Sequence, residues 1–351
     1  MSKPVTAFDG HNDALLRMYL DTSGDPIASF INGGGRGHLD LPKARAGHLA
    51  GGFFAVFVPP AEKFDFSPMG NATYDMPLPP ELELDYARTV TLGQVSVLLR
   101  LEAASNGQIV VCRTAGEIRA ATARGALAAL LHIEGVEAID KDLHMLDVLY
   151  AAGLRSLGPV WSRNNIFAHG VPFRFPGSPD VGPGLTDAGR RLVAACNRLG
   201  VVVDLSHMNE QGFWDVAKLS TAPLVATHSN VHALTETPRN LTARQLDAIR
   251  DSDGVVGLNF SVSFLRPDGR NNPDTGFDIM LAHLDAMIER VGETRVALGS
   301  DFDGAMIPRE IGDASGLPKL FDAMRAHGYG DELVERIAYG NWLSLLERTI
   351  G

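Results

Sequence analysis

Histidine and carboxylate side chains recur directly after short apolar segments of this sequence. His11 and Asp13 come after the first such segment, residues 5–8. They lie two residues apart, so on an extended chain both face the same way. An imidazole nitrogen and a carboxylate oxygen together suit zinc. Such a pair also occurs by chance in solvated turns, and it predicts a metal site only when similar pairs accompany it.

Three further ligand-type residues end later apolar segments. Glu134 follows residues 126–133. A carboxylate is costly to bury there unless it is paired or binds a metal, and its two oxygens can bridge two cations. His207 and His228 each end a segment of their own. Because the same placement recurs, we expect these side chains to meet in one metal site. His132 is a competing ligand that the sequence leaves open.

The last apolar segment also ends in a carboxylate. Asp301 lies within the sequence GSDFDG at residues 299–304. In a two-metal hydrolytic site, a carboxylate in this place can take a proton from a metal-activated water and pass it to the leaving amine. We therefore predict that Asp301 is the catalytic residue for proton transfer.

The segments that position these residues alternate with helical patterns, which is typical of repeated β-α units. The expected strands are residues 5–8, 52–58, 126–133, 155–160, 201–205, 224–227, 255–259 and 296–299. The expected helices are residues 81–104, 143–152, 187–199, 210–219, 243–251 and 278–291, then 317–326 and 332–348 after the last strand. Eight alternating units favour an α/β fold with a single closed (β/α)8 TIM-type barrel over a doubly wound open sheet.

The rest of the chain predicts one domain over residues 1–351. Residues 59–80 are rich in proline and aromatic residues and are expected to form a loop insertion. Residues 109–112 form a small extra strand in this interpretation. Residues 167–184 hold many glycines and prolines, and we expect this loop to cover the active site at the barrel mouth.

Composition restricts the partners and the compartment. The formal net charge is -11 and no basic cluster occurs, which argues against nucleic acid as a partner. No signal peptide or apolar span is seen, so we expect no membrane partner. Cys112 and Cys196 lie far apart without metal-type spacing, and a reducing cytoplasm is therefore the expected location.

Six motifs in order resemble the membrane dipeptidase (renal dipeptidase) family of the amidohydrolase superfamily, over nearly the whole chain. They are FDGHND at 8–13, HIEG at 132–135, DLSH at 204–207, THSN at 227–230, PRN at 238–240 and GSDFDG at 299–304. The resemblance implies a binuclear zinc enzyme, with two Zn²⁺ per chain, that hydrolyses dipeptides by a metal-activated water. L-L dipeptides are the expected substrates, and L-D dipeptides are left open.

The resemblance also implies a role for each site residue. One ion is held by His11 and Asp13, the other by His207 and His228, and Glu134 bridges them. Asp301 matches the proton-handling carboxylate of the family. Arg239 matches the residue that binds the carboxylate of the dipeptide, which a planar guanidinium can do through two charge-assisted hydrogen bonds.

One position departs from the family pattern. The fourth strand of the family ends in a histidine that holds the substrate carbonyl oxygen, whereas Trp161 stands there in this chain. An indole donates one hydrogen bond but cannot become cationic. We predict that Trp161 contacts the substrate, and that zinc, Arg163 or His169 stabilises the oxyanion.

Two other functions stay open at this stage. The same site can serve another amide, such as a cyclic amide, a lactam or an N-acyl amino acid, although Arg239 has little use in a substrate without a free carboxylate. A non-catalytic metal-binding homologue is less favoured, because every ligand and Asp301 are retained. Manganese, cobalt and iron are alternatives to zinc. A homodimer is a further expectation from the family.

Overall fold

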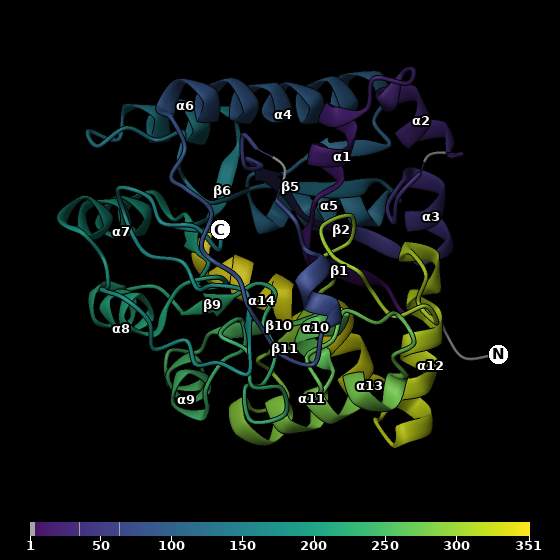
Figure 1. Ribbon diagram of the computed structural model, residues 1–351. Helices are drawn as coiled ribbons and strands as arrows, with labels where there is room; N and C mark the ends of the chain where they lie inside the picture. The colour runs from purple at the N-terminus through teal and green to yellow at the C-terminus, as the bar shows by residue number, and fades with distance from the viewer. Residues whose placement is uncertain (1–3, 35, 63) are drawn as a thin grey trace.

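Eight parallel strands form a nearly closed barrel that helices surround (Figure 1). The computed structural model describes residues 4–34, 36–62 and 64–351. The barrel strands are β1 Ala7–Asn12, β2 Leu49–Phe57, β5 Leu127–Glu134, β6 Leu154–Gly158, β8 Val202–Val203, β9 Val225–Ala226, β10 Val255–Asn259 and β11 Val296–Gly299. Their order is β8-β6-β5-β2-β1-β11-β10-β9, and the backbone N–H of Leu205 closes the ring by donating to the Val225 carbonyl oxygen (2.8 Å). The predicted (β/α)8 fold is confirmed.

The helices are α1 Ala14–Leu20, α2 Pro26–Asn32, α3 Leu41–Ala46, α4 Leu84–Ala104, α5 Ala115–Ala123, α6 His144–Ala152, α7 Asp187–Leu199, α8 Glu210–Leu219, α9 Ala243–Asp251, α10 Val262–Leu265, α11 Phe277–Val291, α12 Leu317–His327, α13 Asp331–Glu335 and α14 Asn341–Thr349. Short 3-10 turns occur at Ser67–Gly70 and Ala314–Gly316. The final helix predicted over residues 332–348 is interrupted, because Arg336–Gly340 forms a π-helical turn between α13 and α14.

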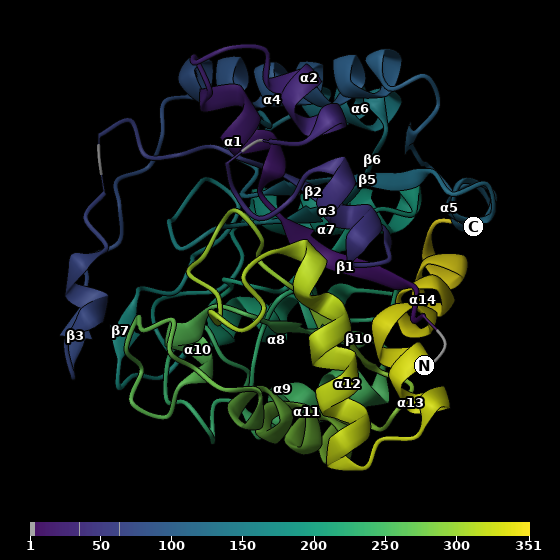
Figure 2. The same ribbon diagram turned by 90° about the vertical axis from the view of Figure 1, so that its right-hand side faces the viewer.

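Two short pairings lie outside the barrel. Strand β4 (Ile109–Val111), which lies within the small strand predicted over residues 109–112, pairs with β5. Strands β3 (Tyr74–Asp75) and β7 (Arg174–Phe175) form an antiparallel pair that ties the two long predicted loops together. Figure 2 shows this pair on the side of the molecule opposite the two chain ends. Neither β3 nor β7 was predicted, because a two-residue strand has no readable periodicity.

The amino end of the barrel interior is packed with apolar side chains. Phe8, Phe53 and Leu130 meet Trp342 of α14 there, and the ring centroids of Phe53 and Trp342 are 5.0 Å apart. The Trp342 indole donates to the carbonyl oxygen of Leu298 (2.8 Å). The indole N–H of Trp342 thus has a partner within this apolar end of the barrel. The packed apolar side chains lie beneath the polar side chains at the carboxyl end.

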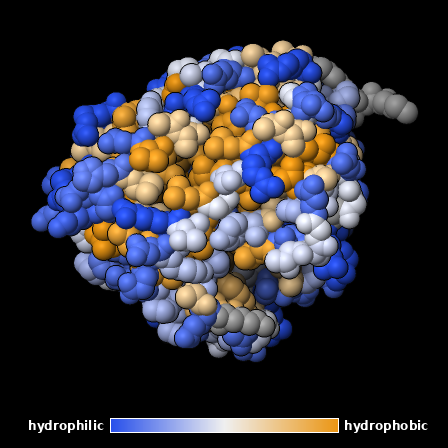
Figure 3. All heavy atoms as spheres, turned by 90° about the horizontal axis from the view of Figure 1, so that it is seen from above, coloured by the Kyte–Doolittle hydropathy of each residue, from blue (hydrophilic) through white to orange (hydrophobic). Residues whose placement is uncertain are grey.

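The outer surface over α4 and α6 carries exposed apolar side chains. Figure 3 views this face from above and shows hydrophobic residues interspersed with hydrophilic ones. Leu92 and Leu99 of α4 and Val148 of α6 are among the exposed large hydrophobic residues. Within the described ranges, no helix has the length and apolar character needed to cross a membrane.

Candidate metal centre

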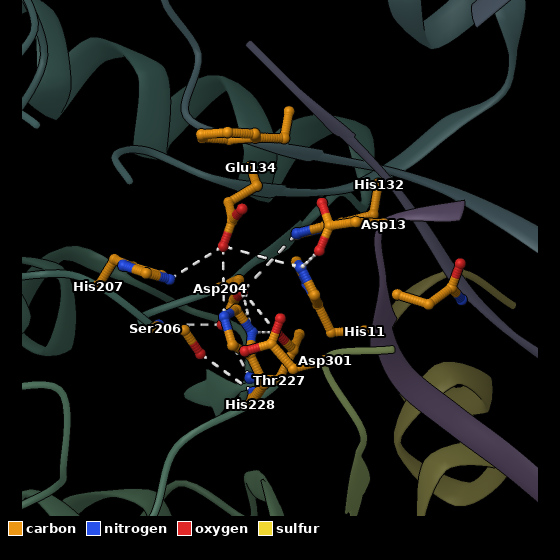
Figure 4. A network of polar contacts seen from close by, with 12 residues as sticks. His11, Asp13, His132, Glu134, Asp204, Ser206, His207, Thr227, His228 and Asp301 are labelled. Atoms are coloured by element: carbon orange, nitrogen blue, oxygen red, sulfur yellow. Dashed lines mark hydrogen bonds and ion pairs between the residues drawn. The ribbon is translucent and has the colours of Figure 1, made fainter. Parts of the chain in front are cut away.

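The five predicted ligands converge at the carboxyl end of the barrel (Figure 4). Glu134 is the last residue of β5, and its Oε1 lies 3.0 Å from His207 Nε2 and 3.2 Å from His228 Nε2. The same oxygen lies 3.8 Å from His11 Nε2. Asp13 caps the start of α1, with Oδ2 3.3 Å from His11 Nε2. Side chains from three other strand ends, those of β1, β8 and β9, thus surround the Glu134 carboxylate.

Asp301 also lies in this cluster. Two overlapping groups of buried side chains bring their ligand atoms within 4.8 Å of one another: His11 with Glu134 and His228, and His11 with Asp13 and Asp301. Asp301 Oδ2 accepts a hydrogen bond from Asn259 Nδ2 (3.0 Å), which holds the carboxylate at the edge of the cluster. The geometry is compatible with a proton-transfer role beside two cations.

The hydrogen bonds of His228 determine which of its nitrogens carries the proton. The Thr227 hydroxyl donates its only proton to Asp204 Oδ2 (2.6 Å), so toward His228 Nδ1, 2.8 Å away, it can only accept. His228 therefore has its proton on Nδ1 and presents a bare Nε2 lone pair to Glu134. Two electron-rich atoms 3.2 Å apart repel each other unless a proton or a cation lies between them.

His207 is oriented in a related way, because its Nδ1 lies 2.8 Å from Ser162 Oγ and its Nε2 faces Glu134. Sequence reasoning did not assign a role to Ser162, Thr227 or Asp204. Thr227 and Asp204 could have been found, because both belong to the motifs that carry His228 and His207. Ser162 lies 45 residues before His207, and only the fold brings the two together.

Four buried polar atoms of the cluster lack a hydrogen-bond partner among the described residues. No atom of the described residues makes a hydrogen bond to either ring nitrogen of His11, to His228 Nε2 or to Asp13 Oδ1. Buried polar atoms are nearly always paired, and unpaired ones at one spot point to a ligand. One proton can satisfy only one of the nitrogens that face Glu134, whereas cations can satisfy all of them. The nitrogen and oxygen donors suit zinc-type ions.

The ionisation behaviour of the cluster supports the same interpretation. Burial raises the pKa of Glu134 well above its usual range, and nearby Asp13 adds to this while His11 opposes it. Burial also raises the pKa of Asp301. For His11, burial favours the neutral form, but the Glu134 and Asp13 carboxylates outweigh it and raise the pKa to about 10. The clustered carboxylates thus favour positive charge at this place, which bound cations would supply.

Two site residues have a strained backbone. His207 and Asp301 have φ angles of 66° and 59°, in the left-handed region that non-glycine residues rarely adopt. Such strain persists only where the surroundings impose it, and it is concentrated at functional sites. The turns at the ends of these two strands therefore aim both side chains at Glu134 and His11.

His132 has other partners and belongs to neither ligand group. Its Nδ1 lies 2.9 Å from Ser156 Oγ, and its Nε2 lies 3.7 Å from Asp204 Oδ2. Burial lowers the pKa of His132 to about 3, which keeps the ring neutral. It lies on the face of β5 that carries Glu134, one step deeper in the barrel. The structure thus gives His132 a supporting position beneath the cluster.

A cavity of about 560 Å³ opens above the cluster. Asp13, Glu134, His207 and Asp301 form its floor, and Trp161 lines its wall. The Trp161 ring lies 5.9 Å from the His207 ring. Trp161 thus lines the cavity beside a predicted ligand.

Arg239 lies buried next to the cluster. Its Nη2 donates to the carbonyl oxygen of His228 (3.1 Å), while its Nε has no partner among the described residues. Burial lowers the pKa of Arg239 to about 10, and Asp301 and Glu134 oppose this effect, so the guanidinium remains charged at neutral pH. An incompletely paired buried cation is suited to binding a carboxylate.

The two alternatives for oxyanion stabilisation do not line this cavity. Arg163 is fully buried, and its guanidinium pairs with Glu137 (2.9 Å) and the carbonyl oxygen of Val58 (2.8 Å). His169 Nδ1 lies 3.1 Å from the carbonyl oxygen of Gly184, in a separate hollow. Both predictions were wrong about location, because a loop residue near a strand end gives no indication of its direction.

Comparison with known proteins places this geometry in a family. The family model of membrane dipeptidase, peptidase family M19, matches residues 1–349. The chain belongs to the membrane dipeptidase family. As in the family, it is a metal-dependent dipeptidase, and the resemblance inferred from the six motifs is confirmed.

Two solved metallopeptidase structures and one uncharacterised curated protein are similar to this chain. A metallopeptidase from Rhodobacter sphaeroides, liganded with a phosphinate mimic of the dipeptide L-Ala-D-Ala, is 53% identical, with a TM-score of 0.97 over 99% of this chain and 100% of that one. The metallopeptidase dipeptidase AC of family M19 gives the same identity, TM-score and coverage. An uncharacterised Klebsiella pneumoniae protein, encoded in the pqqA 5' region, is 49% identical over 72% of this chain and 94% of its own length.

Proposed function

We propose that this dipeptidase holds two zinc ions per chain and cleaves both L-L and L-D dipeptides. The observation that carries the proposal is the position of Glu134 Oε1, within 3.0–3.8 Å of three imidazole Nε2 atoms from different strands. In this proposal His11 and Asp13 would hold one ion, His207 and His228 would hold the other, and Glu134 would be a ligand to both. The L-Ala-D-Ala mimic bound by the Rhodobacter relative supports the L-D class.

Each protein group has a definite task in this mechanism. A bound pair of divalent cations supplies the Lewis acidity that activates water near neutral pH and polarises the peptide carbonyl. Asp301 accepts a proton and delivers it to the departing amine nitrogen. Arg239 binds the carboxylate of the dipeptide through its unpaired edge. Trp161 donates its indole N–H to the substrate. Fixing both ends of the substrate selects for dipeptide length.

The test combines metal content with a substrate panel. Elemental analysis of the purified chain should give about two zinc ions, and a mixed L-L and L-D panel should release free amino acids in a chelator-sensitive way. Cleavage of cyclic amides or N-acyl amino acids in place of dipeptides would contradict the substrate. Full activity with a single ion would contradict the binuclear site.

The cellular setting is part of the proposal. We propose a cytoplasmic enzyme, and the observation in its favour is that Cys112 and Cys196 are both free and buried, as a reducing compartment allows. The expected partner is the dipeptide itself, and a homodimer stays a prediction. Light scattering of the purified protein checks the homodimer.

A further inference from the structure

We propose that the active-site cavity recognises a large apolar side chain on the C-terminal residue of the dipeptide. This inference rests on the proposed function, and it names the substrate class that the site prefers. The recognising surface is an aromatic wall, which we define by the rings of Phe57, Phe64, Phe66, Trp161, Phe173 and Phe264. All six line the cavity: Phe57 ends β2, Phe264 lies in α10, and the other four lie in the loops at the barrel mouth.

The rings of the aromatic wall form one continuous surface. Phe64 and Phe66 are 4.9 Å apart between ring centroids, and Phe66 is 5.6 Å from Phe173. Phe173 is 5.4 Å from Trp161 and stacks in parallel with Phe264 at 6.2 Å. These are normal spacings for aromatic pairs. The wall thus connects Phe66, which is 42% exposed, with rings buried near the floor.

The deep part of the wall touches the groups that fix the substrate. Trp161 and Phe173 lie 5.9 Å and 6.5 Å from the His207 ring. The Arg239 guanidinium carbon lies 5.2 Å from the Phe264 ring centroid. The side chain of a C-terminal residue branches from the carbon next to the carboxylate. A carboxylate held by Arg239 therefore places that side chain beside Phe264 and Phe173.

The charges around the cavity favour an uncharged side chain. No lysine or arginine is among the described residues that line the cavity; Arg239 is buried beside it, next to the Phe264 ring, and in this proposal the C-terminal carboxylate of the substrate occupies it. The carboxylates of the lining belong to the metal centre or to the rim. Asp303 is paired with Arg17 (3.0 Å), and Glu62 lies exposed at the mouth. An acidic substrate side chain would lose water against the aromatic wall without gaining a partner. The polar lining residues Ser261 and Ser263 belong to the α10 segment.

The first test compares matched dipeptides on the zinc-loaded full chain: Ala-Ala, Ala-Leu, Ala-Phe, Ala-Asp and the reversed Phe-Ala. Burying a leucine or phenylalanine side chain on the wall should raise kcat/KM about 10- to 100-fold over Ala-Ala. Phe-Ala should not show this gain, and Ala-Asp should be the poorest substrate. Equal rates for Ala-Ala and Ala-Phe, or a preference for Phe-Ala, would overturn the proposal.

A variant of the wall makes the test specific. Phe66→Ala should lower the ratio of kcat/KM between Ala-Phe and Ala-Ala several-fold, and Phe66→Leu should restore part of it. Leu92→Ala, a similarly exposed apolar residue on α4, is the matched control and should leave the ratio unchanged. An unchanged ratio in Phe66→Ala, with a normal thermal melt, would contradict the assignment.

Binding measurements separate this inference from the proposed function. Calorimetry with phosphinate mimics of Ala-Phe and Ala-Ala reports on the wall without turnover, and the Ala-Phe mimic should bind about 10- to 100-fold more tightly. If no dipeptide is cleaved but the Ala-Phe mimic still binds more tightly, the proposed catalytic function is wrong and the proposed recognition by the aromatic wall is supported. If dipeptides are cleaved and the two mimics bind equally, the wall proposal fails alone.

Discussion

The same eight strands build two unlike ends of the barrel interior. Along one face of β5, Leu130 packs at the amino end, and Glu134 enters the metal centre at the carboxyl end. At the amino end, even the polar atom of Trp342 has a partner in the Leu298 carbonyl oxygen. At the carboxyl end, both ring nitrogens of His11 lack one. The indole N–H at the amino end is therefore paired within the protein, whereas the His11 nitrogens at the carboxyl end are available to a ligand.

The difference shows where stability and function reside in this chain. Closely packed rings at the amino end stabilise the fold. The clustered carboxylates and the left-handed backbone at His207 and Asp301 destabilise the opposite end until a ligand compensates for them. Substitutions at the carboxyl end should therefore change turnover or metal binding, and substitutions at the amino end should change the free energy of unfolding.

The largest effect is expected at the carboxyl end. Asp301→Asn removes the proton acceptor but keeps the shape, so turnover should fall about 10²- to 10⁴-fold while zinc content stays near two ions. Steady-state kinetics and elemental analysis on one preparation check this. The exposed Asp274→Asn is the matched control. Loss of one zinc ion in Asp301→Asn would show that Asp301 is a ligand instead.

A substitution at the amino end should have the opposite character. Trp342→Ala leaves a cavity beside Phe53 and Phe8 and removes the bond to Leu298, so the free energy of unfolding should fall by about 3–5 kcal/mol. Urea unfolding measures the change. The zinc content of the folded protein should not move. A loss of zinc at unchanged stability would mean that the two ends are not separable as described.

The fold was largely predictable because each barrel strand is a separate apolar run. Helices α7, α8 and α9 have the predicted bounds, since their apolar faces repeat clearly and threonine or asparagine caps their starts. Helices α1, α2 and α3 were missed, because six or seven residues give too few turns for a pattern. Helix α5 was missed too, although it has nine residues like the predicted α9. The β3–β7 pairing depends on two distant loops meeting.

The ligand-type residues of the candidate site could be predicted from the sequence, but the residues that support them could not. Ligand-type residues could be recognised because histidines and carboxylates are rarely placed at the ends of apolar strands without a function. Their supporting residues could not, since Ser162 and Thr227 are ordinary hydroxyl residues until the fold sets them against His207 and His228. The direction of Arg163, toward Glu137 and away from the cavity, likewise depends on packing.

A smaller effect is expected from the support of His228. Thr227→Val keeps the shape but removes the acceptor for the Nδ1 proton, so zinc affinity should fall about 10- to 100-fold. Competition with a chromophoric chelator measures it. Thr227→Ser retains the hydroxyl and should restore most of the affinity. If the valine and serine variants bind zinc equally, the hydroxyl does not set the tautomer.

The smallest effect is expected at His283, which is buried like His11 but has a hydrogen-bond partner for each ring nitrogen. His283 Nε2 lies 2.9 Å from the Leu265 carbonyl oxygen, and Nδ1 accepts from the Val231 backbone N–H. Burial lowers its pKa from 6.5 to about 4. Between these two pH values, His283 is therefore protonated in the unfolded chain but neutral in the folded one. Its contribution to stability is complete above pH 6.5 and is lost as the pH falls toward 4.

Between pH 7 and pH 5 the contribution of His283 to the free energy of unfolding should therefore drop by roughly 1–2 kcal/mol. Denaturant unfolding of the metal-free protein at both values measures the drop, and His283→Gln should show less pH dependence by that amount. His11 has neither of these bonds, and cations are expected to take their place. An equal pH dependence in the wild-type and glutamine proteins would mean that burial does not hold His283 neutral in the folded chain.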